Sequence, residues 1–254
     1  MYPLHYQSYG SGIPLIVLHG LFGSSDNWFA TAQNLAERYT VFTLDARNHG
    51  ASPHCDMMTY KLMARDVVEF MQRHHLDSAV ILGHSMGGKT AMVMADEYPD
   101  YVQKVIVVDI APKEYDPRHL EILEALENLD LAAHTTRKTL DEALSGKISN
   151  RSVRQFLLKN VKRDAADEFF WQLNLTALRR NYENLNGTTI PKSPVQIPVC
   201  FIRGGKSDYI LPEDEELIHA HFTSTTVETI ANATHWVHAD APEKFVNLVR
   251  EFIG

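Results

Sequence analysis

The sequence predicts an α/β fold in which a mostly parallel sheet lies between layers of helices, and three observations support this. Short apolar runs alternate with amphipathic stretches along most of the chain. Most of these runs are uninterrupted Val, Ile and Leu, which is typical of strands buried on both faces. The chain has 254 residues, of which 44% are hydrophobic. This is enough for a single domain with a substantial core.

The order of the elements also predicts an insertion. The predicted strands are residues 4–9, 15–19, 40–45, 78–82, 102–110, 199–203 and 226–230, and the predicted flanking helices are 28–38, 60–74, 86–98, 213–221 and 242–252. Between 113 and 194 there are only helical patterns, at 120–129, 136–143, 152–159 and 167–178. We therefore expect a core of residues 1–112 and 195–254 with a helical cap at 113–194. An insertion of this kind would cover the crevice at the carboxyl ends of the strands.

Composition excludes several classes of protein. The net charge is −8 and no Lys/Arg cluster forms a basic stripe, so neither nucleic acid nor an anionic membrane surface is an expected partner. No apolar run approaches the roughly 18 residues of a membrane span, and the amino terminus lacks the pattern of a leader, so we expect a cytoplasmic protein. Cys55 and Cys200 lack the spacing of a disulfide framework and are expected to be reduced. No metal-binding pattern occurs.

The most informative motif is Gly-His-Ser-Met-Gly at residues 83–87. It follows a predicted strand and precedes a predicted helix, which is the setting of the nucleophile elbow of α/β-hydrolases. The turn is so sharp that side chains at its first and last positions would clash, so Gly83 and Gly87 leave room for an exposed Ser85 hydroxyl. Ser85 is the predicted nucleophile.

The predicted base is His235. In α/β-hydrolases the serine comes first in the chain, the acid next and the histidine last. His235 follows the last predicted strand and precedes the last helix, where a loop can bring an imidazole over the elbow. His238, three residues later, is expected to close this loop or to line the pocket.

Two aspartates are candidates for the acid that orients His235. Asp208 comes soon after the predicted strand 199–203, and Asp109 lies at the end of the predicted strand 102–110. Either carboxylate could fix the tautomer of the imidazole and stabilise the imidazolium that forms during the reaction. The other would have a structural role, such as accepting bonds from backbone N–H groups at a strand end.

Two backbone N–H groups are predicted to form the oxyanion hole. One belongs to Met86, directly after the nucleophile, and the other to Leu21, in the loop His-Gly-Leu-Phe-Gly-Ser after the second predicted strand. This loop matches neither phosphate-binding glycine pattern. The segment 45–52 is interpreted as a structural turn with polar anchors.

With these motifs in order, the chain resembles the YbfF-type esterases of bacteria and their mitochondrial relatives, within the α/β-hydrolase superfamily. The segments that carry the resemblance are HGLFGS (19–24), DARNHG (45–50), GHSMGGK (83–89), DIAP (109–112) and HWVHA (235–239). It implies an α/β-hydrolase fold with a mostly parallel eight-stranded sheet and a helical cap. It also implies a serine esterase for short acyl esters and for thioesters such as acyl-CoA. It favours Asp109 as the acid, because members of this group often lack an aspartate where Asp208 stands.

The predicted function is therefore a serine carboxylesterase for short-to-medium acyl esters, with acyl-CoA thioesters as further substrates. It would act without a cofactor or a metal. Its partner is a small-molecule acyl ester or thioester, and the expected assembly is a monomer or a small homo-oligomer. Two alternatives stay open: a perhydrolase or C–C bond hydrolase with the same residues, and a non-catalytic binding module, because a fold does not determine a function.

Overall fold

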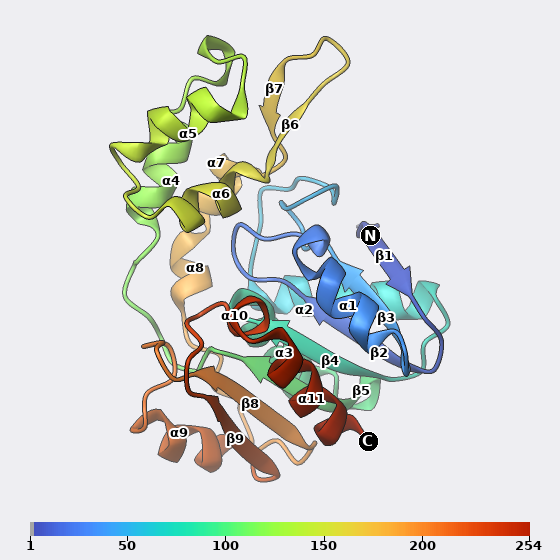
Figure 1. Ribbon diagram of the computed structural model, residues 1–254. Helices are drawn as coiled ribbons and strands as arrows, with labels where there is room; N and C mark the ends of the chain where they lie inside the picture. Colours follow the sequence, from blue (N-terminus) through green and yellow to red (C-terminus); the bar gives the residue numbers. More distant parts are fainter. Residues whose placement is uncertain (1–2) are drawn as a thin grey trace.

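A seven-stranded sheet forms the centre of the computed structural model, which describes residues 3–254 (Figure 1). The strands follow the order β1-β3-β2-β4-β5-β8-β9, and every neighbouring pair is parallel except β1 with β3. Their bounds are β1 Tyr6–Tyr9, β2 Ile13–Leu18, β3 Tyr39–Leu44, β4 Ala79–His84, β5 Val102–Val108, β8 Val199–Gly204 and β9 Thr225–Ile230. Met1 and Tyr2, on which the expectation about a leader partly rests, lie outside the described residues.

The predicted number of eight strands is wrong by one. Each of the seven strands predicted from the sequence forms one strand of this sheet. Within residues 3–254 the two remaining strands, β6 and β7, pair only with each other. No further apolar run was available to supply an eighth strand.

The central strands are apolar because both of their faces are covered. In β4, Ile81 packs into a core cluster on one face of the sheet, while Val80 and Leu82 pack into a second cluster on the other. Successive side chains of a strand point to opposite faces, so a strand between two helical layers needs an apolar residue at every position.

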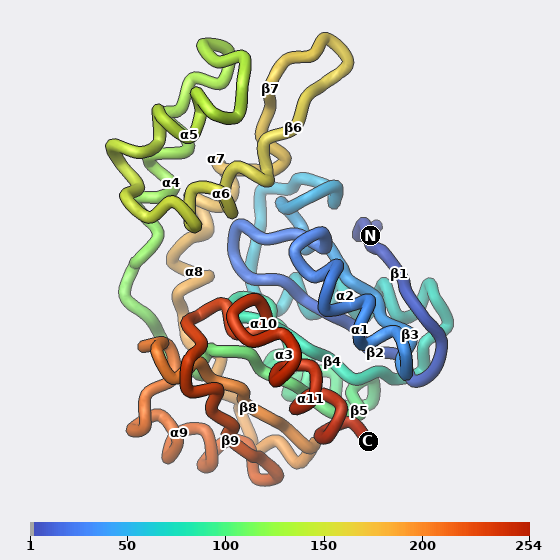
Figure 2. Tube along the Cα trace, viewed as in Figure 1, coloured from blue at the N-terminus to red at the C-terminus, as the bar shows by residue number. Residues whose placement is uncertain are grey.

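Helices cover both faces of the sheet. Those of the core are α1 (Phe29–Leu35), α2 (Tyr60–Arg73), α3 (Met86–Glu97), α9 (Asp214–His221), the short α10 (Val237–Asp240) and α11 (Pro242–Ile253). Residues of α2, α3 and α9 belong to one core cluster, and residues of α1 and α11 belong to the other. Figure 2 shows α1 and α11, from opposite ends of the chain, on the same side of the sheet.

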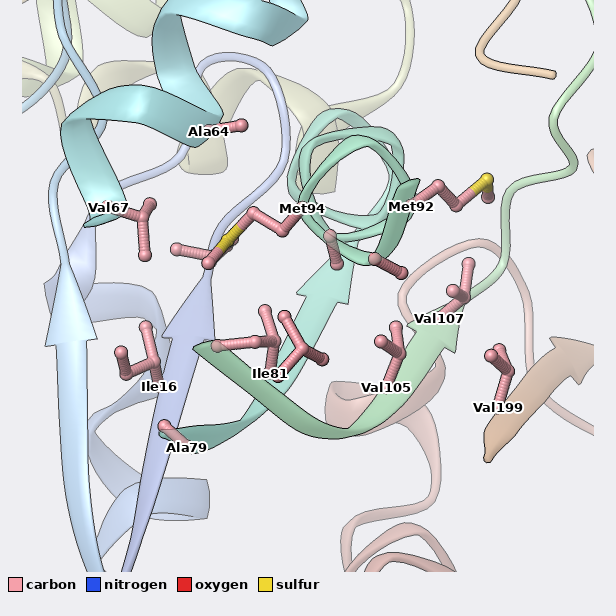
Figure 3. Packing of buried hydrophobic residues seen from close by; sticks show 14 of the residues in the cluster. Ile16, Ala64, Val67, Ala79, Ile81, Met92, Met94, Val105, Val107 and Val199 are labelled. Atoms are coloured by element: carbon pink, nitrogen blue, oxygen red, sulfur yellow. The ribbon is translucent and has the colours of Figure 1, made fainter. Parts of the chain in front are cut away.

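Helix α3 is anchored on the sheet by its methionines (Figure 3). Met94 extends toward Val67 of α2, while Met92 leaves the helix in another direction, and both are fully buried. The same cluster contains Ile81 of β4 and Val105 of β5. The helix that follows Ser85 is therefore packed against β4 and β5.

Residues 113–194, which lie within the connection from β5 to β8, are called the inserted segment below. It contains α4 (Leu120–Glu127), a 3₁₀ turn (Leu131–Ala133), α5 (Arg137–Ser145), α6 (Arg151–Leu158), β6 (Val161–Arg163), β7 (Phe169–Trp171), α7 (Leu175–Arg180) and α8 (Tyr182–Asn186). A third apolar cluster joins its helices to the core through Phe22, Tyr60 and Met86. It therefore packs over the loops that follow β2 and β4 (Figure 1).

The expectation of an all-helical insertion is wrong in one region. The predicted helix 167–178 is instead a strand, Phe169–Trp171, followed by the short helix α7. Asp164 begins a tight turn by accepting bonds from the backbone N–H groups of Ala166 and Glu168. The three aromatic residues after this turn favour a strand, and β6 provides the partner.

No helix within residues 3–254 is both long enough and apolar enough to cross a membrane. The Sγ atoms of Cys55 and Cys200 are free thiols in the structure.

Candidate active site

Ser85 lies on a strained turn between β4 and α3. Its backbone has φ 52° and ψ −115°, a conformation that non-glycine residues rarely adopt. A Cβ atom on Gly83 would lie 2.1 Å from the carbonyl oxygen of Gly87, and one on Gly87 would lie 2.2 Å from the carbonyl oxygen of Leu18. Both positions therefore require glycine, and the turn leaves the serine side chain at the end of the strand.

The structure brings His235 and Asp109 together. His235 lies in the loop after β9, and its Nδ1 is 2.7 Å from Oδ2 of Asp109, which directly follows β5. The carboxylate is fully buried and accepts two further bonds, from the N–H of Gly204 at 2.8 Å and from the hydroxyl of Ser207. A carboxylate held by three donors keeps a proton on Nδ1 of His235, which leaves Nε2 as the acceptor.

Asp208 lies elsewhere. Its side chain is 67% exposed and forms an ion pair with Arg118, with 2.7 Å between Nη1 and Oδ1. The hydrogen bond from Arg118 lowers the pKa of this carboxyl group. The guanidinium of Arg118 also lies over the ring of Tyr209. The same ring stacks on the imidazole of His235, with 3.8 Å between ring centroids. No hydrogen bond or ion pair joins Asp208 to His235 among the described residues, and the carboxylate that His235 contacts is that of Asp109.

The residues predicted for the oxyanion hole flank Ser85. Met86 begins α3, and Leu21 lies in the loop after β2. A Cβ atom on Gly20 would lie 3.3 Å from Cβ of Ser85, so this loop packs directly against the elbow. Among the hydrogen bonds of residues 3–254, none is donated by the backbone N–H of Leu21 or of Met86. Both N–H groups are free to bind a substrate oxygen.

Two histidines complete the surroundings of the base. Nε2 of His84 is 2.8 Å from the carbonyl oxygen of His235, and burial lowers the pKa of His84 well below its usual value. His238 stacks on Trp28 with 4.0 Å between ring centroids, and burial lowers its pKa to about 3. Both imidazoles are therefore neutral near pH 7. The role of His84 was missed from the sequence, where only its place beside Ser85 could have drawn attention.

A cavity of about 250 Å³ connects these groups. Ser85 and His235 line it together with Leu21, and His238 borders it as expected. The inserted segment contributes part of its walls, with the apolar Ile122, Val153, Phe156 and Leu157 beside His119, and Phe22, Tyr209 and Trp236 also line it. The arrangement offers a serine, an imidazole and two free N–H groups in one largely apolar chamber.

The turn after β3 is polar and structural, as predicted. Asp45 accepts bonds from the backbone N–H groups of Ser25 and Ala51, and Arg47 forms a buried pair with Asp66 at 2.6 Å. None of these side chains is among those that line the cavity. Among residues 3–254 no group of three or more His, Cys, Asp or Glu side chains is arranged to hold a metal ion.

The sheet order, the elbow and the placement of the inserted segment together define an α/β-hydrolase. The chain belongs to the α/β-hydrolase family: the model of the alpha/beta hydrolase fold matches residues 13–129, and several full-length relatives are more than 30% identical.

Three of these similarities narrow the class to esterases and lipases. The chain is 38% identical over 250 residues to the sn-1-specific diacylglycerol lipase ABHD11 of Xenopus laevis, covering 95% of this chain and 80% of the relative. It is 32% identical over 250 residues to the esterase YbfF of Escherichia coli, covering 98% and 96%. A marine microorganism esterase of known structure superposes with a TM-score of 0.96 at 42% identity, covering 99% and 100%. The resemblance to YbfF-type esterases is confirmed, and the chain is a member of the esterase and lipase part of the family.

Proposed function

We propose that the protein is a serine carboxylesterase that hydrolyses short-to-medium acyl esters through an acyl-enzyme intermediate. One observation carries the proposal. His235 is bonded through Nδ1 to the buried carboxylate of Asp109 at 2.7 Å and lines the same cavity as Ser85. This is the arrangement in which an imidazole can take the proton of a serine hydroxyl.

In the first half of the reaction, Oγ of Ser85 attacks the ester carbonyl while Nε2 of His235 accepts its proton. Asp109 stabilises the imidazolium that forms. Negative charge develops on the carbonyl oxygen, and the N–H groups of Leu21 and Met86 bind it. When the tetrahedral intermediate collapses, the imidazolium returns the proton to the leaving alcohol.

In the second half, water attacks the acyl group on Ser85. His235 again accepts the proton, the same two N–H groups bind the oxyanion, and the carboxylic acid leaves as Oγ regains its proton. No step needs a group from outside this chain apart from water. Asp208 has no direct part in this cycle, since its carboxylate is occupied by Arg118.

The substrate class follows from the cavity. About 250 Å³ lined by Ile122, Val153, Phe156 and Leu157 suits a short-to-medium acyl chain. Since these side chains come from residues 113–194, we propose that the inserted segment is a cap on a core of residues 1–112 and 195–254. Acyl thioesters such as acyl-CoA present the same carbonyl to the same groups, so they are included in the proposal.

The test is turnover of p-nitrophenyl esters from acetate to octanoate, with acyl-CoA thioesters in parallel. Ser85→Ala should lower kcat by about 10⁴-fold or more, because the nucleophile is lost. Ser224→Ala is the matched control, since Ser224 is exposed in the loop before β9, at the opposite end of that strand from the His235 loop. Equal rates for wild type and Ser85→Ala would refute the proposal.

Labelling with a fluorophosphonate separates the remaining outcomes. A wild-type enzyme that is labelled at Ser85 but turns over no ester would point to perhydrolysis or C–C bond hydrolysis at the same residues. A wild-type protein that is neither labelled nor active would point to a binding module. Either result would exclude the carboxylesterase.

A further inference from the structure

Lys89 is a buried lysine that the proposed mechanism does not use. It lies on α3, one helical turn after Ser85, and only 1% of it is exposed. Within residues 3–254 its ammonium group forms no ion pair with a carboxylate. Instead, Nζ donates to the carbonyl oxygens of Lys113 at 2.8 Å, Asn186 at 3.2 Å and Gly187 at 2.6 Å.

These three carbonyls belong to the two connections of the inserted segment. Lys113 lies where the chain leaves β5, and Asn186 and Gly187 lie at the end of α8, where the chain returns toward β8. The connections run side by side (Figure 1), since the N–H of Thr189 donates to Pro112 at 2.9 Å. One side chain from the helix of the nucleophile therefore binds both ends of the inserted segment.

The chemistry of lysine fits this position. An ammonium group has three N–H donors, one for each carbonyl, and the rings of Tyr60 and Tyr115 lie 5.7 and 4.9 Å from Nζ. Burial lowers the pKa of Lys89 to about 7. Near neutral pH both forms are present, and the amine keeps two of the three donors. An apolar residue here would leave the buried carbonyls of Lys113 and Gly187 without this partner.

Two features connect Lys89 to the proposed reaction. It borders a narrow crevice that also contains Ser85 and Met86. The inserted segment that it holds contributes four apolar side chains to the walls of the main cavity, those of Ile122, Val153, Phe156 and Leu157. A shift of the two connections would move those walls relative to Ser85 without touching any reacting group.

We propose that Lys89 is a positioning residue of the ester-binding site, which fixes the inserted segment over Ser85 through the carbonyls of both connections and thereby sets the affinity for the acyl chain. This inference rests on the proposed esterase function, because its main readout is ester turnover.

The chain offers a matched control. Lys104, on β5, also donates from Nζ to two backbone carbonyls, those of Phe252 at 2.8 Å and Ile253 at 2.9 Å, and lies over the ring of Phe252. Its partners belong to the carboxyl-terminal helix and not to the inserted segment. Lys104→Met therefore removes the same kind of bonds without touching the connections.

The experiment compares Lys89→Met with Lys104→Met. We expect Lys89→Met to raise KM for p-nitrophenyl butyrate and octanoate by about tenfold and to change kcat by less than about threefold, which is the signature of lost binding. Limited proteolysis should cut residues 112–115 and 186–190 faster in this variant. In Lys104→Met, KM and both cleavage rates should match the wild type.

Unchanged KM and cleavage rates in Lys89→Met, or the same changes in both variants, would overturn the inference. If Lys89→Met fails to fold, Lys89→Arg and Lys89→Gln replace it. Arginine keeps the charged donors and should retain a near wild-type KM, while the shorter glutamine should raise it; equal KM values for these two would also overturn the inference. Fluorophosphonate titration of the wild type tests the esterase proposal separately. A wild type that is not labelled would refute the esterase proposal, but it would not refute the role of Lys89 in holding the inserted segment.

Discussion

The imidazole of His84 donates from Nε2 to the carbonyl oxygen of His235 at a distance of 2.8 Å. The residue before the proposed nucleophile therefore holds the loop that carries the proposed base. Ser85 and His84 are consecutive and both line the cavity, and His84 also binds the backbone of the His235 loop. Burial keeps His84 neutral, so it has one N–H for this bond.

The bond from His84 should be needed for turnover more than for binding. We expect His84→Leu to lower kcat about 10- to 100-fold, because a buried carbonyl without its donor costs about 1–3 kcal/mol and the His235 loop can shift. His84→Gln retains an N–H donor and should recover part of the rate. Steady-state kinetics with p-nitrophenyl butyrate gives both parameters. A rise in KM at constant kcat would contradict this role.

The two candidate acids should differ strongly. Asp109→Asn should lower kcat by about 10⁴-fold, since an amide at that position cannot fix the tautomer of His235. Asp208→Asn should cost less than about tenfold, because it removes only an exposed ion pair with Arg118. Both variants should be checked for folding by circular dichroism before kcat is compared. The opposite ranking would assign the acid to Asp208.

The elbow should not tolerate a methyl group at Gly83. In Gly83→Ala the new Cβ would meet the backbone of Gly87 at 2.1 Å, and neither segment can move without displacing α3 from the sheet. We expect a loss of about 3 kcal/mol or more in the free energy of unfolding, or no soluble protein. Gly146→Ala is the control, since nothing lies within 4 Å of its Cβ. Similar unfolding midpoints for these two variants would show that the turn is less tightly packed than described.

Space in the cavity should control acyl-chain length. Val153 lies in the wall that the inserted segment contributes, and Val153→Phe would fill part of the 250 Å³. We expect kcat/KM for the octanoate to fall about tenfold or more, with less than about a twofold change for the acetate. A uniform fall across the chain-length series would instead mean that Val153 does not face the acyl group.

Lys89 should make stability depend on pH in a defined window. Its pKa is lowered to about 7 in the folded protein from 10.5 in the unfolded chain. Between these values the unfolded state binds more protons, so the free energy of unfolding rises with pH by up to about 1.4 kcal/mol per unit. Well below pH 7 both the folded and the unfolded state hold this proton, so Lys89 no longer makes the free energy of unfolding depend on pH. In Lys89→Met this pH-dependent contribution to the free energy of unfolding should be absent.

Urea unfolding of both proteins at pH 6, 7, 8 and 9 isolates the effect of Lys89. The difference in the free energy of unfolding between wild type and Lys89→Met should change little from pH 6 to 7, where Lys89 only begins to lose its proton, and should move in favour of the wild type from 7 to 9. A difference that is the same at all four values would contradict the lowered pKa.

Much of the fold could be predicted because its determinants are local. The central strands appear as apolar runs, since a strand covered on both faces cannot carry polar residues in its middle, whereas the edge strands β1 and β9 are partly exposed and more polar. Gly83 marks the elbow locally, because the clash that excludes other residues is with the backbone of Gly87 and Gly88, within six positions of the chain; the clash at Gly87 is with the distant Leu18. The hairpin of β6 and β7 was missed because three-residue strands are too short to show an alternating pattern.

The sequence by itself determined the strand-turn-helix around Ser85, the late position of His235 and the presence of a long segment between two strands of the sheet. Only the tertiary structure decided which aspartate meets that histidine, because the answer depends on which strand ends are adjacent in space. Asp109 and His235 are 126 positions apart and in contact, whereas Asp208, much nearer in sequence, turns to Arg118. The bonds of Lys89 and His84 likewise end on backbone carbonyls of distant segments, and a carbonyl leaves no trace in residue identity.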